Sequence, residues 1–100
     1  MAYKIFFFDE VKEDIKEAKR WYKKQSLGIE KRFAKDIKNC IISLTQNPYA
    51  HAVRYKQVRI AYPLIFPYAV RYYINETNAI IVITAVVHNS RNPYHSEERL

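Results

Sequence analysis

The spacing of apolar residues changes at Asn47-Pro48, and this change divides the chain into a helical half and a strand half. Before it, apolar residues recur every three or four positions from Val11 to Leu44, which is the spacing of one face of an α-helix. After it, apolar and polar residues alternate, most clearly over 66–74, as in a strand with one buried face. The residue before a proline disfavours helical geometry, so the helical half is expected to end here. The pattern predicts an α+β protein.

The helical half predicts two helices joined by a short turn. Asp9 can cap the first helix, whose early acidic residues suit the positive end of its dipole. Gly28, the only glycine, supplies a stop near Ser26, and a second helix is expected from about Ile29. Two amphipathic helices connected in this way form an αα-hairpin. The inner face of the second helix is expected to carry Ile29, Phe33, Ile37, Cys40, Ile41 and Leu44.

The remaining segments predict a mostly antiparallel sheet of about four strands. A short aromatic run over 3–8 precedes the first helix and favours a strand. Three more strands are expected over 53–60, 66–74 and 80–87, and the last is almost entirely apolar, as in a central strand buried on both faces. Short connections predict an antiparallel meander, with the helical hairpin covering one face. We expect a single domain over residues 1–100.

Composition limits the classes of protein that fit. Apolar residues make up 49% of the 100 residues, which provides a core and excludes wholesale disorder. The longest apolar run, 80–87, is far shorter than the roughly 18–20 residues of a membrane span, and a cytoplasmic location without membrane contact is expected. Cys40 is the only cysteine, so an internal disulfide and a cysteine-based metal cluster are both excluded. No glycine-rich phosphate loop is present.

The charge balance points to acidic partners. Lysine and arginine total 17 against 10 aspartate and glutamate residues, which gives a net charge of +7. Such an excess attracts polyanions, either nucleic acid or an acidic protein. The charge identifies no site by itself.

An ordered set of residues resembles the RelE/ParE superfamily of bacterial toxins. In the helical half the shared positions are Ala18, Tyr22, Leu27-Gly28, Phe33, Ile37, Ile41 and Asn47-Pro48. In the strand half they are Phe66-Pro67-Tyr68, Val70, Tyr72, Ile81, Ile83, Ala85-Val86, His88, Arg91 and Pro93. Two C-terminal motifs are similar to the ParE branch in particular. They are Phe66-Pro67-Tyr68 leading into a strand, and the run from Ala85-Val86 through His88 and Arg91 to Pro93.

The resemblance implies the toxin of a type II toxin–antitoxin module of the plasmid-stabilisation kind. Such toxins are held inactive by a cognate antitoxin, through which alone they contact operator DNA. ParE-like members are associated with inhibition of DNA gyrase, whereas RelE-like members cut mRNA on the ribosome without a metal or cofactor. Gyrase inhibition is the leading expectation. The alternatives are a ribosome-dependent mRNA endonuclease and a degenerate, non-toxic member that only binds antitoxin. No cofactor is expected.

A nuclease of this kind would need a base, a cationic clamp and an acid around one phosphate. The candidates for these catalytic roles are Arg59, Arg71, His88, Arg91 and Tyr94. Histidine can serve as base or acid near neutral pH, and arginine presents a planar donor fork to phosphate. Each candidate also has a structural interpretation, as a solvated strand residue, a turn-fixing histidine or a tyrosine packed on the sheet.

One feature weakens the nuclease interpretation. RelE-like nucleases are similar in carrying an arginine directly after the tyrosine that opens the central strand. Ala69 occupies that position here, so part of the cationic clamp is absent.

The aromatic residues suggest partner-binding surfaces. Nine tyrosines, five phenylalanines and one tryptophan are many for a core of this size. Trp21, Tyr55, Tyr62 and Tyr73 are the candidates for contact with an antitoxin segment, because exposed tyrosine and tryptophan anchor protein interfaces well. The alternative is that these rings pack flat on the sheet with their polar atoms in water.

Overall fold

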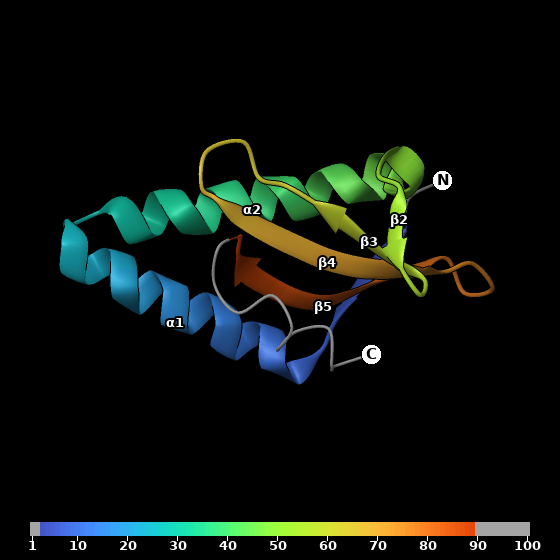
Figure 1. The fold of residues 1–100 in the computed structure, drawn as a ribbon, viewed down its shortest axis with the longest axis horizontal. Coiled ribbons are helices and arrows are strands. Elements are labelled where there is room, and N and C mark those ends of the chain that lie inside the picture. Colours follow the sequence, from blue (N-terminus) through green and yellow to red (C-terminus); the bar gives the residue numbers. More distant parts are fainter. Residues whose placement is uncertain (1–2, 90–100) are drawn as a thin grey trace.

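The computed structural model describes residues 3–89, which form a helical hairpin packed on a five-stranded sheet (Figure 1). The elements in chain order are β1 (Lys4–Phe7), α1 (Asp9–Gln25), α2 (Ile29–Gln46), the 3₁₀ turn η1 (Pro48–Ala50), β2 (Val53–Tyr55), β3 (Val58–Ala61), β4 (Tyr68–Asn75) and β5 (Ile80–His88). The strand order is β1-β5-β4-β3-β2. β1 runs parallel to β5, and the other neighbours are antiparallel. The α+β class and the antiparallel meander are confirmed.

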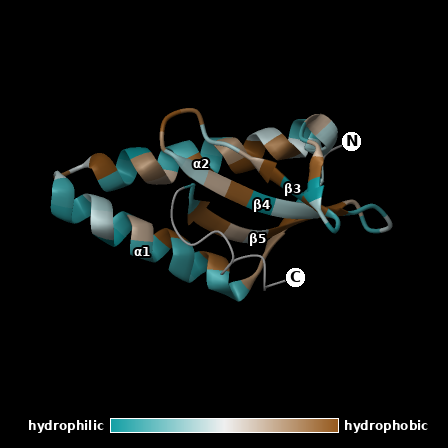
Figure 2. Ribbon diagram, in the orientation of Figure 1, coloured by the Kyte–Doolittle hydropathy of each residue, from teal (hydrophilic) through white to brown (hydrophobic). Residues whose placement is uncertain are grey.

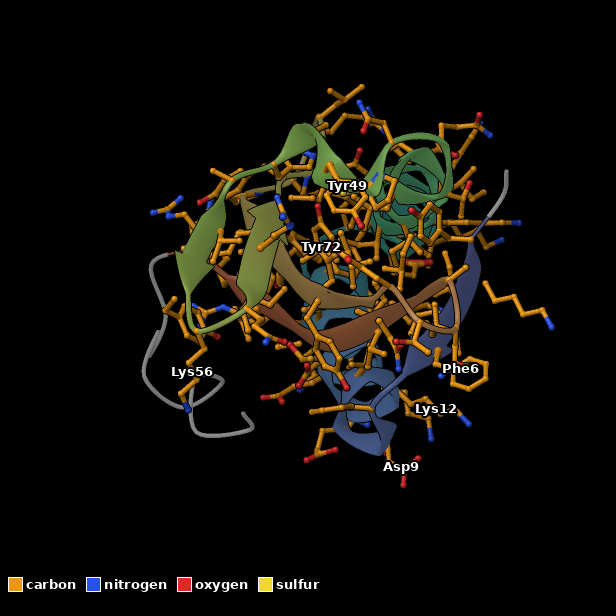
Figure 3. All side chains as sticks on the ribbon, turned by 90° about the vertical axis from the view of Figure 1, so that its right-hand side faces the viewer. Phe6, Asp9, Lys12, Tyr49, Lys56 and Tyr72 are labelled. Carbon is orange, nitrogen blue, oxygen red and sulfur yellow. The ribbon has the colours of Figure 1, made fainter. Side chains whose placement is uncertain are left out.

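The sheet has one strand more than the sequence predicts, because the segment 53–60 is a hairpin. β2 and β3 are joined by the two-residue turn Lys56-Gln57, and Lys56 has a positive φ of 48°. Figure 3 shows Lys56 projecting from the tip of this hairpin. Two-residue hairpin turns favour asparagine, aspartate or glycine. Because this turn has lysine and glutamine instead, the sequence did not predict it.

The first helix begins without the predicted aspartate cap. Phe8 is the N-cap residue, Asp9 is the first helical residue, and the cap has no side-chain hydrogen bond. The Phe8 amide instead donates to the Ile83 carbonyl (2.9 Å), and the Phe8 carbonyl accepts from the Val11 amide (3.0 Å). The sheet therefore holds the start of the helix directly. Asp9 still lies in the first turn, where its charge suits the helix dipole.

The predicted ends of both helices are confirmed. α1 stops at Gln25, and Gly28 adopts the left-handed φ of 92° that turns the chain into α2. α2 ends at Gln46, directly before Asn47-Pro48. Within residues 3–89, neither helix combines the length and apolarity that crossing a membrane requires.

The core lies between the helical hairpin and the sheet, where α1 packs on β5 and α2 on β4. Alternation along β4 points Val70 and Tyr72 towards the helices, and both are fully buried. An aromatic cluster closes one end of this core, with ring centroids 4.8–6.2 Å apart. Its members are Tyr22, Phe33, Phe66 and Tyr68. Hydropathy colouring marks the apolar stripes along both helices and the strands (Figure 2).

Candidate functional site

The candidate site residues on the strands lie on both faces of the sheet. Arg71 lies between Val70 and Tyr72, so it points to the face that α1 and α2 leave uncovered. Its partners across the sheet are Ile60 on β3 and Ala85 on β5. Arg71 is only 5% exposed. The expected placement of Arg71 opposite the core-facing residues of its strand is confirmed.

A tyrosine from the β2–β3 hairpin engages Arg71. The guanidinium Nη1 of Arg71 donates to the Tyr55 hydroxyl (3.1 Å), and its carbon lies 5.7 Å from the centre of the Tyr55 ring. A second arginine–tyrosine pair lines the same cavity, in which Arg54 Nη1 lies 3.5 Å from the Tyr62 hydroxyl. These four side chains border a cavity of about 320 Å³. Two guanidinium groups and two hydroxyl groups suit an anion.

His88 also borders this cavity, although its ring packs elsewhere. His88 lies directly opposite Tyr68 across β4 and β5, and the two rings meet edge to face at 5.2 Å. Directly paired residues share a face of the sheet, so the imidazole is on the side of the Tyr68 ring. This contact agrees with a structural role at the end of β5.

Arg59 lies on the other face of the sheet from Arg71. It pairs across the strands with Tyr72, the residue after Arg71, and therefore points to the helix side. Its guanidinium donates to the carbonyl of His51 (2.6 Å) and lies 5.1 Å from the centre of the Tyr49 ring. These contacts tie the segment after α2 to the sheet. The structure does not bring Arg59 together with Arg71.

Two tyrosines, Tyr49 and Tyr72, lie near Arg59 at this end of the molecule (Figure 3). The Tyr72 hydroxyl donates to the carbonyl of Pro48 (2.7 Å). Burial raises the pKa of Tyr72 to about 12, opposed by the positive charge of Arg59. The exposed Tyr49 hydroxyl donates to Glu76 (2.9 Å), and this hydrogen bond is the main reason that the pKa of Tyr49 rises to about 12. Both phenols therefore stay protonated at neutral pH.

The remaining catalytic candidates, Arg91 and Tyr94, lie outside the described residues. Within residues 3–89, no group of three or more histidine, cysteine, aspartate or glutamate side chains is placed to hold a metal ion.

The four aromatic partner candidates differ in exposure. Trp21 on α1 is 43% exposed and Tyr62 after β3 is 48% exposed, as their assignment to a surface requires. Tyr55 and Tyr73 are half-buried. Tyr55 and Tyr62 belong to the arginine cavity, whereas Trp21 lies on the helical hairpin, edge to face with Tyr22. The four residues therefore do not form one continuous patch.

Sequence reasoning missed an apolar loop beside α2. The segment between β3 and β4 carries Leu64, 96% exposed, and Ile65, 64% exposed. Figure 2 shows this loop as an apolar arch next to α2. Residues of this loop and of α2 line a groove of about 560 Å³. The signal available in the sequence was the apolar run Leu64-Ile65-Phe66 between Pro63 and Pro67, which is too short and too rigid for a strand.

Asp36 holds this loop. Its carboxylate accepts hydrogen bonds from three consecutive backbone amides, those of Leu64 (3.2 Å), Ile65 (3.0 Å) and Phe66 (2.8 Å). Asp36 is 5% exposed and lies among the apolar residues of the inner face of α2. Its position on that face was the second signal, because a buried aspartate needs donors from another segment.

Comparison with known proteins supplies the family context. Residues 5–93 match the family described as the ParE toxin of the type II toxin–antitoxin system parDE. No curated protein matches significantly. A solved structure of the chromosomal ParDE toxin–antitoxin system from P. aeruginosa superposes with a TM-score of 0.74 at 14% identity, covering 87% of this chain and 96% of that chain. The RelBE2 toxin–antitoxin complex from Mycobacterium tuberculosis gives 0.63 at 17% identity, covering 89% and 100%.

Proposed function

This chain belongs to the ParE toxin family of type II toxin–antitoxin systems, and from that premise we propose that it arrests growth by inhibiting DNA gyrase and that a cognate antitoxin neutralises it. The family match extends over residues 5–93 and so includes both the helical hairpin and the sheet. Gyrase is the target associated with the ParE-like branch that the C-terminal motifs resemble.

The observation that carries the choice of gyrase over mRNA is the separation of the two central arginines. Metal-free RNA cleavage requires its cationic and acid–base groups on a single phosphate. Arg59 and Arg71 lie on opposite faces of the sheet, and each binds groups of the protein itself. Arg71 is 5% exposed, which leaves its guanidinium little surface for a phosphate. Ala69 provides no side chain for a clamp.

The antitoxin as partner is supported by two observations. The two solved structures named above are described as a toxin–antitoxin system and a toxin–antitoxin complex. The net charge of +7 favours an acidic partner, which it attracts over the range of the Debye length.

The test is a pair of assays on the same folded protein. We expect purified toxin to inhibit supercoiling of relaxed plasmid by gyrase and to leave mRNA uncut in a reconstituted translation reaction. Cognate antitoxin added at equal concentration should restore supercoiling. Cuts at ribosome-occupied codons that are lost in Arg71→Ala would replace gyrase with mRNA as the target. Absence of growth arrest on induction without antitoxin would identify a non-toxic member.

A further inference from the structure

We propose that the groove between α2 and the β3–β4 loop is a docking site for an acidic, amphipathic segment of the antitoxin. This inference rests on the antitoxin partner proposed above. Of the four aromatic candidates for antitoxin contact, only Tyr62 lines this groove. The groove is lined by the exposed side of α2 and by the loop, residues 62–65.

The loop displays apolar side chains on a rigid backbone. Leu64 and Ile65 are 96% and 64% exposed, although their backbone amides are fixed by the Asp36 carboxylate. Pro63 and Pro67 restrict the backbone on either side, and the buried Phe66 ring anchors the loop in the aromatic cluster. Much of the backbone entropy of the loop is therefore already lost in the free protein. Binding of a partner then orders the two side chains but requires little further ordering of the loop backbone.

The opposite wall of the groove is basic. Arg32 and Lys35 are exposed on α2, and Asn39 continues the same side of the helix one turn later. The one carboxylate among the lining residues, Asp36, is buried and engaged with the loop amides. The accessible ionised groups of this groove are thus cations. Their complement is a segment that places carboxylates against α2 and apolar side chains against the loop.

The shape of the groove also fits a protein segment rather than a small molecule. A volume of about 560 Å³ lies open between a helix and a loop, and its apolar residues project from the rim. An amphipathic helix laid in a groove is a common mode of peptide recognition, with apolar anchors at intervals of three and four residues. The two aliphatic side chains then act as the anchors of the interface.

Titration of purified cognate antitoxin into the purified full-length toxin tests this proposal. Leu64→Ser combined with Ile65→Ser should weaken the Kd by about a hundredfold, since two interface anchors are lost. Leu27→Ser is the matched control, because Leu27 is an equally exposed leucine (90%) in the turn between the helices. It should leave the Kd unchanged. Unchanged melting temperatures will establish that all variants are folded.

The cationic wall is tested separately. Arg32→Gln combined with Lys35→Gln should weaken antitoxin binding by about tenfold at low salt and by less at high salt. Lys12→Gln combined with Lys16→Gln removes two exposed lysines of α1 and should have no comparable effect.

Four results would overturn the proposal. Wild-type affinity in both groove variants would place the antitoxin elsewhere while leaving it as the partner. Loss of gyrase inhibition with antitoxin binding intact would assign the groove to the target. A wild-type dimer that the Leu64→Ser, Ile65→Ser variant converts to a monomer would assign it to a second copy of the chain. Failure of the wild-type toxin itself to bind antitoxin would overturn the proposed partner as well.

Discussion

Two buried charged side chains, Asp36 and Arg71, show how differently a charge can be accommodated in this small protein. Each is 5% exposed. Asp36 accepts hydrogen bonds from three backbone amides of a loop about thirty residues away in the sequence. Arg71 instead donates to the Tyr55 hydroxyl and lies near the Tyr55 ring. The first contact fixes the path of the chain, whereas the second joins two side chains on strands already paired through β3.

The comparison suggests that buried side-chain contacts to backbone determine stability here, and that side-chain pairs shape the surface. Tyr72 belongs to the first group, since its hydroxyl donates to the Pro48 carbonyl. Tyr49 belongs to the second, because its hydroxyl donates to Glu76 at the surface. Substitutions at these residues test this division.

Asp36→Ala should cause the largest loss. Removing the carboxylate breaks three charge-assisted hydrogen bonds and releases the loop, which we expect to lower the free energy of unfolding by about 3 kcal/mol. Asp36→Asn, which keeps one acceptor oxygen, should lose less. Urea denaturation measures both. A loss below about 1 kcal/mol in Asp36→Ala would show that the prolines and Phe66 hold the loop without this carboxylate.

Cys40 links the same aspartate to the pH dependence of stability. Burial, and secondarily the charge of Asp36, raise the pKa of the Cys40 thiol from 9.0 to about 11. Because the folded-state pKa is the higher one, the contribution of this thiol is complete below about pH 9 and is lost as the pH rises through 11. We expect wild-type protein to lose about 2 kcal/mol more than Cys40→Ala over this interval.

Urea denaturation of both proteins at a series of pH values provides the measurement. Tyr72, whose pKa is also raised, is present in both proteins, so its contribution from burial cancels in the difference and only its minor coupling to the Cys40 charge remains. Parallel pH profiles would show that the thiol ionises in the folded state as easily as in the unfolded chain.

Tyr72→Phe should have a smaller effect, a loss of about 1 kcal/mol, because it leaves the buried Pro48 carbonyl without its donor. Tyr49→Phe removes a hydroxyl of an exposed residue and should change stability by less than about 0.5 kcal/mol. Thermal melts of the two variants side by side test the division directly. Equal losses would mean that burial of the acceptor does not separate the two groups of contacts.

The same division explains what the sequence could predict. Local chemistry sets the helix ends, so Gly28 and Asn47-Pro48 predicted them correctly. The pattern of alternation also placed Arg71 opposite Val70 and Tyr72. The Lys56-Gln57 turn escaped prediction because it lacks the usual turn residues.

Local sequence patterns could not predict the long-range contacts. The anchoring of 64–66 by Asp36 joins segments that no spacing rule relates. The face of Arg59 depends on the register of β3 against β4, which pairs Arg59 with Tyr72. Position in the sequence could therefore nominate candidate residues but could not show which of them come together.

Arg71→Met should have a small effect on stability although Arg71 is buried, and it is the sharpest test of the contrast with Asp36. Replacing a buried charged group with an apolar side chain of similar length is often neutral, because the cost of removing the charge from water disappears together with its contacts. We expect a change below about 1 kcal/mol, against about 3 kcal/mol for Asp36→Ala. Urea denaturation of Arg71→Met and Asp36→Ala under the same conditions provides the measurement. A loss as large as that of Asp36→Ala would place Arg71 among the contacts that determine the fold, and the two buried charges would then differ only in sign.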